Sequence, residues 1–553
     1  MKAESLLALC TSRDTRLLHV LQESYGADSG LLESRIRILT TVLKTFLSRF
    51  GDIPVRVFRC PGRINLRGMH VDTHGGYLNL MTHQREVLLA AAPREDDRFT
   101  LANIESQFED MHYALTEWTR TPAFASDWHA FITHPDVQGP ALQRRGHWGN
   151  YLKGASLRLQ HHQRDVSLLG IQGVIGSDLP RGASLSSSTA LSMVVLHALA
   201  ACNELPLEPE TSILLGKEAE WFTGARGGMS DQAAMVLGNR GRLVNVALLP
   251  GRLDVSGARY VAFPEDLHVL VINSYTERSL SGAQLVEYTR NRFAYSMAME
   301  IVRQELARMD PDSGLAEGVQ FLSDLTPSKL GPGSEDLLYH LLLSIPEEEP
   351  IDRLRTRYDL PQLDALYEQY FGTAPEELRP RSIRLRGPLL FGIAESERAR
   401  LFPDALLAHD FARAGRLMRW GHDGDRVRNA DGTPYRYDVR DESIRVLLQR
   451  ATPIEECPGA YGASSPALDL LVDAAHKAGA LGASLTGAGI AGTLLALCKP
   501  SDTEAIIEAI RATLASEHYA TTAALKSPLT PEELHNAAVP NIAVAPLGEL
   551  VFA

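Results

Sequence analysis

The sequence predicts a mixed helix-and-strand protein of two domains. Its 553 residues are too many for one simple core, and 44% hydrophobic with 22% charged residues is ordinary for a globular chain. Apolar side chains recur at helical spacing within residues 1–50, which predicts a helical extension. Three short apolar runs in residues 55–92 (VRVF, YLNLMT and EVLLAAA) predict strands, with glycine-rich turns between them.

Later segments continue this mixed pattern. A strand is expected at 168–175, followed by a turn and an apolar helix from about Thr189. Further strands are expected at 260–272 and 485–497, and an amphipathic helix at 502–514. Residues 305–385 are richer in Pro, Glu and Asp and predict a helical elaboration. The expected units are an extension at 1–50, a first domain at 51–260 and a second at 261–553.

Charge and cysteine content restrict the function. A net charge of -13 argues against nucleic-acid or anionic-membrane partners, which require a basic surface. The five cysteines are scattered without metal-binding spacing, as in proteins of a reducing compartment. No apolar run approaches the ~20 residues of a membrane span. We therefore expect a cytoplasmic protein; its oligomeric state is not predicted.

The segment LPRGASLSSSTA at 179–190 is the strongest candidate for chemistry. A predicted strand leads into a turn of small residues, and a helix begins next to Ser186, Ser187 and Ser188. Backbone amides at a helix N-terminus bind anions, and hydroxyls can contact phosphate oxygens or magnesium. A helix cap needs only one such residue, so three serines favour a phosphate loop. It is not a Walker A loop, because no Gly-Lys-Ser/Thr follows.

A polar segment, PGRINLRGMHVDTHGG, lies between two predicted strands at 61–76. His70 and Asp72 can hydrogen-bond to vicinal hydroxyls, and Arg63 can stabilise charge on a reacting oxygen. Taken alone, the same pattern is typical of a polar turn with a surface Arg–Asp pair.

The segment GARGGMSDQAA at 224–234 places Asp231 after a glycine pair, at the start of a probable helix. An isolated aspartate there is usually an N-cap. Glu218 and Glu220 lie just upstream, where either carboxylate could reach a metal ion.

A late glycine-rich segment, GASLTGAGIAGT, covers 482–493. Gly487, Gly489 and Gly492 permit close approach of the backbone to a ligand. A dinucleotide-binding motif would instead lie early in a βαβ unit with an acidic residue downstream, so this interpretation is disfavoured.

In this order and spacing the four segments resemble the GHMP kinase superfamily and, within it, the galactokinase-like sugar kinases. That family carries GRxNLxGEHxDYNGG, PxGxGLSSS, GxMDQ and TGAGFGG motifs. Smaller matches are WGNYLKG at 148–154, NS at 273–274, EYTRNR at 287–292, GRLM at 415–418 and SPALD at 465–469. The resemblance implies an α+β fold with a ribosomal-protein-S5-like N-terminal domain, a ferredoxin-like C-terminal domain and the active site in the cleft between them.

The resemblance also implies roles for the motif residues. Asp231 would accept or align the proton of the attacking sugar hydroxyl, and Arg63 would stabilise the transferring phosphoryl group. Magnesium would be held by Ser188 and Glu220, with Glu218 as the alternative. The sugar pocket would be lined by Met69, His70, Asp72, Gly228 and Tyr288. ATP would bind to Gly182, Ala183, Ser184, Leu185, Ser186, Ser187, Ser188, Gly487 and Gly489. The product would be the sugar 1-phosphate.

Several residues depart from the family pattern. Met69 replaces the glutamate of EHxDY, and a thioether is a poor hydrogen-bond acceptor, so the C6 end of the sugar is expected to differ from that of galactose. Galacturonate, L-arabinose or a 6-deoxy sugar would suit, unless another side chain supplies the bond and galactose is used. Ser184 and Ala491 replace glycines where the backbone could need unusual dihedrals. A sugar and ATP sensor without turnover, or a kinase of a non-sugar alcohol such as mevalonate or homoserine, are the alternative functions.

Overall fold

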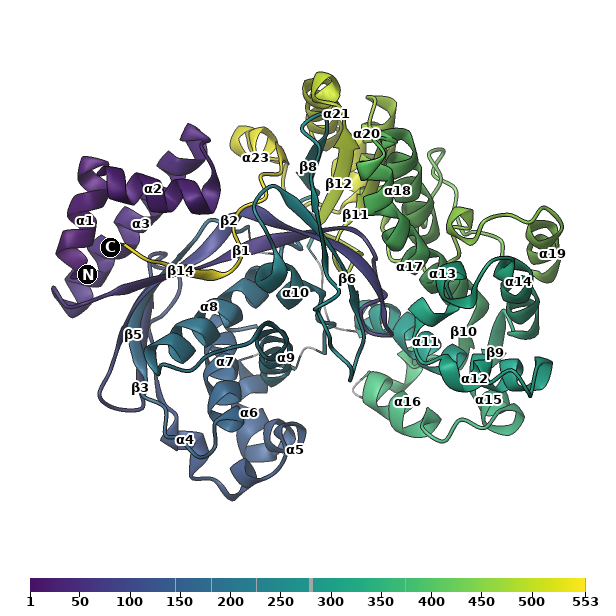
Figure 1. The fold of residues 1–553 in the computed structure, drawn as a ribbon, viewed down its shortest axis with the longest axis horizontal. Helices are drawn as coiled ribbons and strands as arrows, with labels where there is room; N and C mark the ends of the chain where they lie inside the picture. Colours follow the sequence, from purple (N-terminus) through teal and green to yellow (C-terminus); the bar gives the residue numbers. More distant parts are fainter. Residues whose placement is uncertain (145, 181, 225, 278–281, 373, 553) are drawn as a thin grey trace.

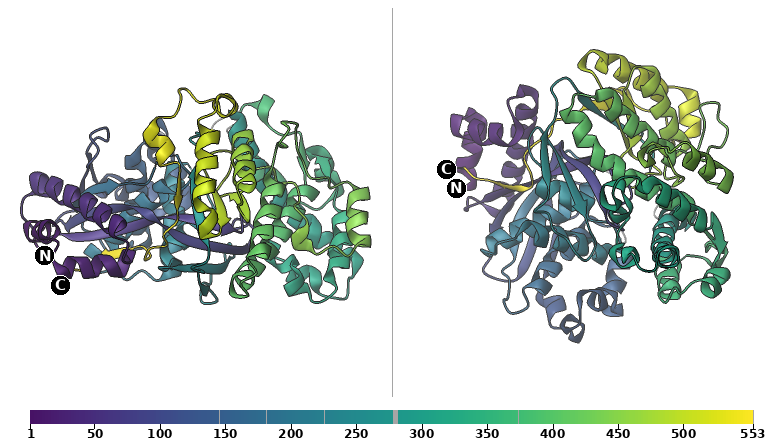
Figure 2. Two further views of the ribbon diagram at one scale, coloured as in Figure 1. Left: turned by 90° about the horizontal axis from the view of Figure 1, so that it is seen from above. Right: turned by 45° about the vertical axis from the view of Figure 1, so that its right-hand side comes forward.

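The computed structural model describes residues 1–144, 146–180, 182–224, 226–277, 282–372 and 374–552. An N-terminal group of helices lies at one end of the molecule and a helical region from the middle of the chain lies at the other (Figures 1 and 2). Both chain termini lie at the same end, beside the N-terminal helices.

A large twisted sheet forms the first half of the molecule. Its strands follow the order β14-β1-β2-β5-β3-β4; β6 pairs with the first part of β2, and β7 pairs with β6. All pairs are antiparallel except β3 with β5. The bounds are β1 Arg56–Arg67, β2 Gly76–Pro93, β3 Arg98–Asn103, β4 Met111–Ala114, β5 Ile171–Ser177, β6 Arg242–Leu248, β7 Arg259–Ala262 and β14 Gly548–Leu550.

Helices cover both faces of this sheet, as the alternation along β2 requires. Val87, Leu89 and Ala91 belong to one core cluster with α7 and α8, whereas the intervening Leu88 and Ala90 belong to another with α1, α2 and α3. The helices on the two faces are α1 Ala3–Ser12, α2 Thr15–Tyr25 and α3 Ser29–Phe50, opposite α4 Thr116–Thr119, α5 Trp128–Thr133, α6 Pro135–Gln143, α7 Trp148–His162, α8 Ser187–Cys202, α9 Pro209–Glu220 and α10 Ser230–Leu237.

A second, four-stranded antiparallel sheet has the order β11-β12-β8-β13. Its strands are β8 His268–Asn273, β11 Gly482–Leu485, β12 Thr493–Cys498 and β13 Ala538–Pro540. The helices of this half are α17 Arg386–Leu407, α18 Phe411–Asp425, α20 Pro466–Lys477, α21 Thr503–Leu514, α22 Glu517–Thr522 and α23 Pro531–His535. The mixed composition of the two halves confirms the predicted α+β fold.

The predicted elaboration is helical and also contains a small sheet that the sequence did not predict. Strands β9 Glu348–Pro350 and β10 Ser382–Arg384 pair within it. Its helices are α12 Leu315–Gly318, α13 Pro327–Leu330, α14 Ser334–Ser344, α15 Ile351–Arg357 and α16 Leu363–Phe371. Two further helices of this region are α11 Gly282–Met309 and α19 Asp441–Gln449.

The C-terminal segment leaves the second sheet and returns to the first. After β13, Asn541 and Ile542 hydrogen-bond to residues of β2, and β14 pairs with β1. The division at 51–260 and 261–553 remains a prediction, but the last residues of the chain pack within the first half of the molecule.

Among the described residues, no helix combines the length and apolar character needed to cross a lipid bilayer.

Candidate active site

Three of the predicted site residues meet around one carboxylate. Asp231 lies in the first turn of α10, and its Oδ1 accepts a hydrogen bond of 2.7 Å from Nε of Arg63 on β1. Its Oδ2 accepts one of 2.5 Å from the hydroxyl of Ser186, just before α8. The Arg63 side chain is only 5% exposed. Donors on both oxygens stabilise the ionised carboxylate and fix its orientation.

These contacts differ from the simple capping roles that the sequence left open. Ser186 occupies the N-cap position of α8, but its side chain makes no capping bond and donates to Asp231 instead. Asp231 is within α10 and is not its N-cap, which is Met229. Both side chains are therefore directed at each other rather than at helix ends.

The late glycine loop packs directly on the phosphate-loop candidate. Thr493 donates a hydrogen bond to the carbonyl of Ala183, and the hydroxyl of Ser184 donates to the carbonyl of Ala491 at 3.3 Å. A Cβ added to Gly492, whose φ is +94°, would lie 2.2 Å from Oγ of Ser184. Only glycine allows this approach at position 492.

Arg63 joins both loops. Its Nη1 donates to the carbonyl of Ser184 at 2.7 Å, and a Cβ on Gly487 would lie 3.1 Å from its Nη2. The guanidinium of Arg63, which extends from β1 of the large sheet, thus contacts both the loop before α8 and the loop between β11 and β12. Gly489, which is also left-handed with a φ of +77°, approaches Ala463 rather than Arg63.

Several non-glycine residues in these loops have left-handed backbone conformations. Ser184 has a φ of 57° and Ser186 a φ of 61°. At the first position the structure agrees with the expectation that a serine in place of glycine needs unusual dihedrals. In the late loop that expectation was wrong for Ala491, because the left-handed residue is Ile490, with a φ of 68°.

The two glutamates proposed as metal ligands have different surroundings. Glu220 accepts a hydrogen bond from Thr189, whose hydroxyl is also 3.5 Å from Oδ2 of Asp231. Burial, reinforced by the negative charge of Asp231, raises the pKa of Glu220 to about 7. Glu218 instead pairs with Arg158 at 2.7 Å. Of the two, only Glu220 lies beside Asp231 and the first turn of α8.

These oxygen donors fit a magnesium ion that is bound partly by a nucleotide. Ser188 lies in the first turn of α8, one residue before Thr189, the hydrogen-bond donor to Glu220. Within the described ranges, no group of three His, Cys, Asp or Glu side chains could hold a metal alone. A hydroxyl, one carboxylate and phosphate oxygens are the hard donor set that Mg²⁺ prefers, and it usually keeps few protein ligands.

The predicted sugar loop is held against α10. Asp72 accepts a hydrogen bond of 3.1 Å from the amide of Ser230, and a Cβ on Gly228 would lie 1.8 Å from its Oδ2. His70, with a φ of 63°, stacks on Tyr461 with ring centroids 4.4 Å apart, and its Nε2 is 3.4 Å from Oδ1 of Asp425.

Met69 has a different environment from the other predicted sugar contacts. Its side chain is 1% exposed and belongs to an apolar core cluster. Its amide and that of Gly68 donate to Oε1 of Glu395, which is fully buried. Although burial opposes the shift, Arg67 and Arg398 hold the pKa of Glu395 below its usual value. Met69 thus packs into the interior, and its place in a sugar pocket remains a prediction.

The side chain of Tyr288, the remaining predicted sugar contact, lies outside the described part of the chain. A small cavity of about 30 Å³ nearby is lined by His70, Arg292, Tyr461 and Ile490 among others. Glu395, Asp425 and Tyr461 were not predicted as site residues, because they support the sugar loop from distant parts of the sequence and carry no local motif.

The chain is similar to known proteins along most of its length. The family described as GHMP kinases N terminal domain matches residues 150–239, GHMP kinases C terminal matches 440–516, and the galactokinase galactose-binding signature matches 44–93. A galactokinase of Chloroflexus aurantiacus is 27% identical over 474 residues, covering 85% of this chain and 91% of that protein. A galactokinase of Roseiflexus sp. is 26% identical over 461 residues, covering 83% and 87%.

A solved structure has the same fold. The galactokinase of Lactococcus lactis, solved in complex with galactose, superposes with a TM-score of 0.57 and 19% sequence identity, covering 92% of this chain and 98% of that one. Fold and family matches together define a two-domain, ATP-using phosphotransferase that has an alcohol group as acceptor. The chain carries matches to both GHMP kinase domains and to the galactokinase galactose-binding signature, and it is a galactokinase-like sugar kinase.

Proposed function

We propose that the protein transfers the γ-phosphoryl group of ATP to the anomeric hydroxyl of a galactose-configured sugar and releases the sugar 1-phosphate. The observation that carries this proposal is the joint contact of Arg63 and Ser186 with the carboxylate of Asp231. It brings the phosphate-loop candidate and the sugar-signature strand to one point. In this proposal the cleft lies between an N-terminal domain at 51–260 and a C-terminal domain at 261–553.

The protein groups act mainly by position and charge. The loop at 182–188 and the start of α8 receive the phosphates, with Gly487 and Gly489 closing over them from the second domain. Asp231 accepts a hydrogen bond from the attacking hydroxyl and aligns it in line with the γ-phosphorus. Because Arg63 and Ser186 already donate to this carboxylate, alignment contributes more than strong basicity. Arg63 stabilises negative charge on the transferring group.

Ser188 and Glu220 hold magnesium in this proposal. When bound, the ion neutralises charge on the phosphate oxygens during transfer. The raised pKa of Glu220, about 7, has the direction expected for a buried carboxylate that ionises fully only beside a cation. Glu218 is excluded from this role in the proposal, because Arg158 neutralises it.

The environment of Met69 bears on which sugar is used. The carboxylate of Glu395 contacts its backbone, but Oε1 already accepts from the amides of Gly68 and Met69, and Oε2 accepts from Arg398 at 2.8 Å. Its acceptor positions are therefore largely used, and it is a poor replacement for the glutamate that galactokinases carry at this position.

A hexuronate such as galacturonate is the second candidate substrate, favoured by a group of three cations, Lys217, Arg226 and Arg292, of which Lys217 lies within the field of Asp72. Nη1 of Arg292 donates to the carbonyl of Arg226 at 2.7 Å, and Arg292 lines the cavity beside His70. Arg226 and Lys217 both lie against the ring of Trp221, and the charges of Asp72 and Arg292 act on Lys217. Such a group would attract a sugar carboxylate.

A coupled ADP-release assay over a panel of sugars tests the function. The panel contains galactose, galacturonate, L-arabinose and a 6-deoxygalactose, with glucose, mevalonate and homoserine as comparisons. We expect turnover with at least one galactose-configured sugar. A product that no longer reacts as a reducing sugar would indicate phosphorylation at the anomeric hydroxyl. Binding of sugar and ATP without ADP release would indicate a sensor, and activity on only the non-sugar alcohols would reject the proposal.

A further inference from the structure

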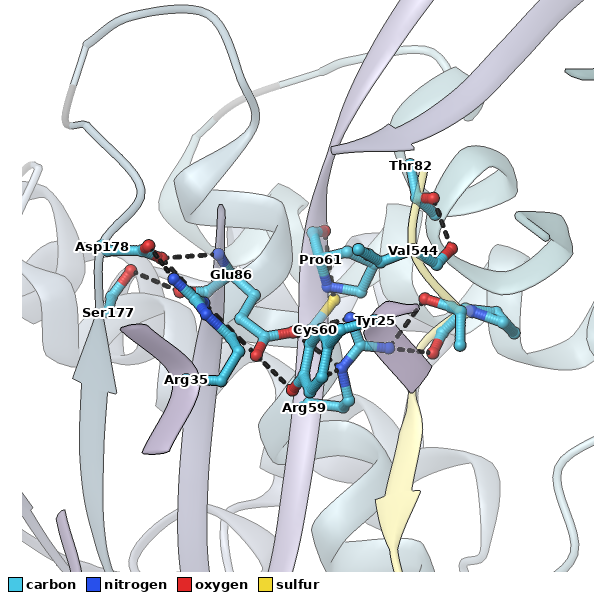
Figure 3. Close-up of polar contacts among 12 residues, drawn as sticks. Tyr25, Arg35, Arg59, Cys60, Pro61, Thr82, Glu86, Ser177, Asp178 and Val544 are labelled. Carbon is cyan, nitrogen blue, oxygen red and sulfur yellow. Dashed lines mark hydrogen bonds and ion pairs between the residues drawn. The ribbon is translucent and has the colours of Figure 1, made fainter. Parts of the chain in front are cut away.

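A buried network of charges links the N-terminal helices to the base of the phosphate-loop candidate (Figure 3). Glu86 of β2 is fully buried, and it accepts hydrogen bonds from the hydroxyl of Tyr25 at 2.5 Å and from Nε of Arg59 at 2.7 Å. Arg35 of α3 lies 3.4 Å from the same carboxylate. Tyr25 and Arg35 both come from the helical extension, so that extension contributes two members of the network.

Arg35 also reaches the residue that begins the loop. Its guanidinium pairs with the carboxylate of Asp178 through both terminal nitrogens, and Asp178 directly follows β5. Oδ1 of Asp178 additionally accepts from the amide of Glu86 at 2.8 Å. Figure 3 shows Arg35 lying between Glu86 and Asp178. Asp178, the first residue after β5, is thus held both by the side chain of Arg35 and by the backbone amide of Glu86.

The opposite side of the same turn rests on the strand that carries Arg63. A Cβ on Gly62 would lie 2.5 Å from Leu179 and 3.2 Å from the carbonyl of Leu185, and the amide of Arg63 donates to that carbonyl at 3.4 Å. Leu179 and Leu185 are both buried. A shift of Asp178 would therefore move the loop relative to β1.

Such a network is a costly way to stabilise a fold. The side chains of Arg35 and Arg59 are 2% exposed and that of Glu86 is fully buried, so three charges are removed from water. Well-packed apolar side chains of similar volume often stabilise a protein as well or better. What buried ion pairs supply instead is a defined geometry, and here that geometry is imposed where the loop begins.

We propose that Arg35 is a positioning residue for ATP binding, and that the helices at 1–50 thereby help to hold the nucleotide site in its binding geometry. By clamping Asp178, Arg35 sets the position from which the loop at 182–188 reaches the phosphates. This inference rests on the proposed function, in which that loop binds ATP.

The test compares ATP dissociation constants, measured by calorimetry with magnesium, for the full-length wild type, Arg35→Met and Arg35→Lys. We expect Arg35→Met to weaken ATP binding by about tenfold and to change KM for the sugar by less than about twofold, because a small misplacement of a binding element is costly. Arg35→Lys keeps the positive charge, so its ATP dissociation constant should lie between those of the wild type and Arg35→Met. If Arg35→Met does not fold, Asp178→Asn is expected to weaken ATP binding in the same way.

Arg386→Met is the matched control. Arg386 is also a buried arginine, 4% exposed, which donates to the carbonyls of Ile345 and Val439 far along the chain from the loop. It should lower the melting temperature but leave ATP affinity unchanged. Equal ATP affinity in Arg35→Met and wild type, or an equal loss in Arg386→Met, would overturn the inference alone. A wild type that does not bind ATP would overturn the proposed function as well.

Discussion

Replacing Glu220 by glutamine should stabilise the metal-free protein while impairing catalysis. Burial raises the pKa of Glu220 from 4.5 to about 7. Between these values the folded protein keeps a proton that the unfolded chain has released, so stability is lost as the pH rises through this window. At about 1.4 kcal/mol per unit of pKa, the ionised carboxylate costs up to about 3 kcal/mol at pH 8. Glutamine has nearly the same shape and remains neutral.

Thermal unfolding in a metal chelator provides the measurement. At pH 4.5 the wild type and Glu220→Gln should melt at similar temperatures. At pH 8 the variant should melt higher, by about 6 °C for a domain of about 200 residues. The same change should reduce kcat/KM by about 100-fold or more, because the proposed function makes Glu220 a ligand to the ion that neutralises charge during transfer.

Glu218→Gln is the matched control, two residues away on the same helix. It removes the partner of Arg158, so it should lower the melting temperature slightly at pH 8 and leave activity nearly intact. A difference in melting temperature between wild type and Glu220→Gln that stays constant from pH 4.5 to pH 8 would refute the assignment of a neutral, half-buried Glu220. Full activity of Glu220→Gln would refute its role at the metal.

Three further predictions concern Asp231, Gly492 and Met69. Asp231→Asn should lower kcat by about 100-fold or more with ATP affinity within about threefold, and a calorimetric loss of ATP binding would contradict its place on the acceptor side. Gly492→Ala should weaken ATP binding by about tenfold, since its Cβ would meet Ser184 at 2.2 Å, whereas Gly462→Ala, which is also left-handed but has open space around it, should not. Met69→Glu should destabilise the fold by about 3 kcal/mol in urea unfolding, because a carboxylate would be buried in an apolar cluster near Glu395. An unchanged unfolding midpoint would show that this side chain is accessible to solvent.

The loops around the site were predictable because their physics is local. Small residues before an apolar helix, and closely spaced glycines, limit the backbone whatever lies elsewhere in the chain. Support from distant residues was not predictable in this way. Glu395 and Asp425 contact the sugar loop from hundreds of residues away, and neither lies in a pattern that marks its role.

Strand β2 shows the same limit within the fold. The sequence predicts two separate strands here, YLNLMT and EVLLAAA, with a turn between them. The structure has one continuous strand from Gly76 to Pro93. His83 and Glu86 are buried within it because Asn541, Arg59 and Tyr25 provide their partners. Hydrogen-bond partners from the N-terminal helices and the C-terminal segment thus allow polar side chains to be buried in the middle of one continuous strand.

The backbone of the proposed nucleotide site depends on both halves of the molecule. Ser184 and Ile490 have left-handed conformations, which cost side chains with a Cβ about 1–2 kcal/mol each, and they come from opposite sides of the junction. Two hydrogen bonds cross it: Ser184 donates to the carbonyl of Ala491, and Thr493 donates to that of Ala183. The amide of Ile490 donates to the carbonyl of Ala463 within its own half. The loop around Ser184 is therefore not expected to keep this shape when the halves separate. Docking of the halves and formation of the phosphate-binding geometry are then one event, so a substitution anywhere in the junction should act first on nucleotide affinity.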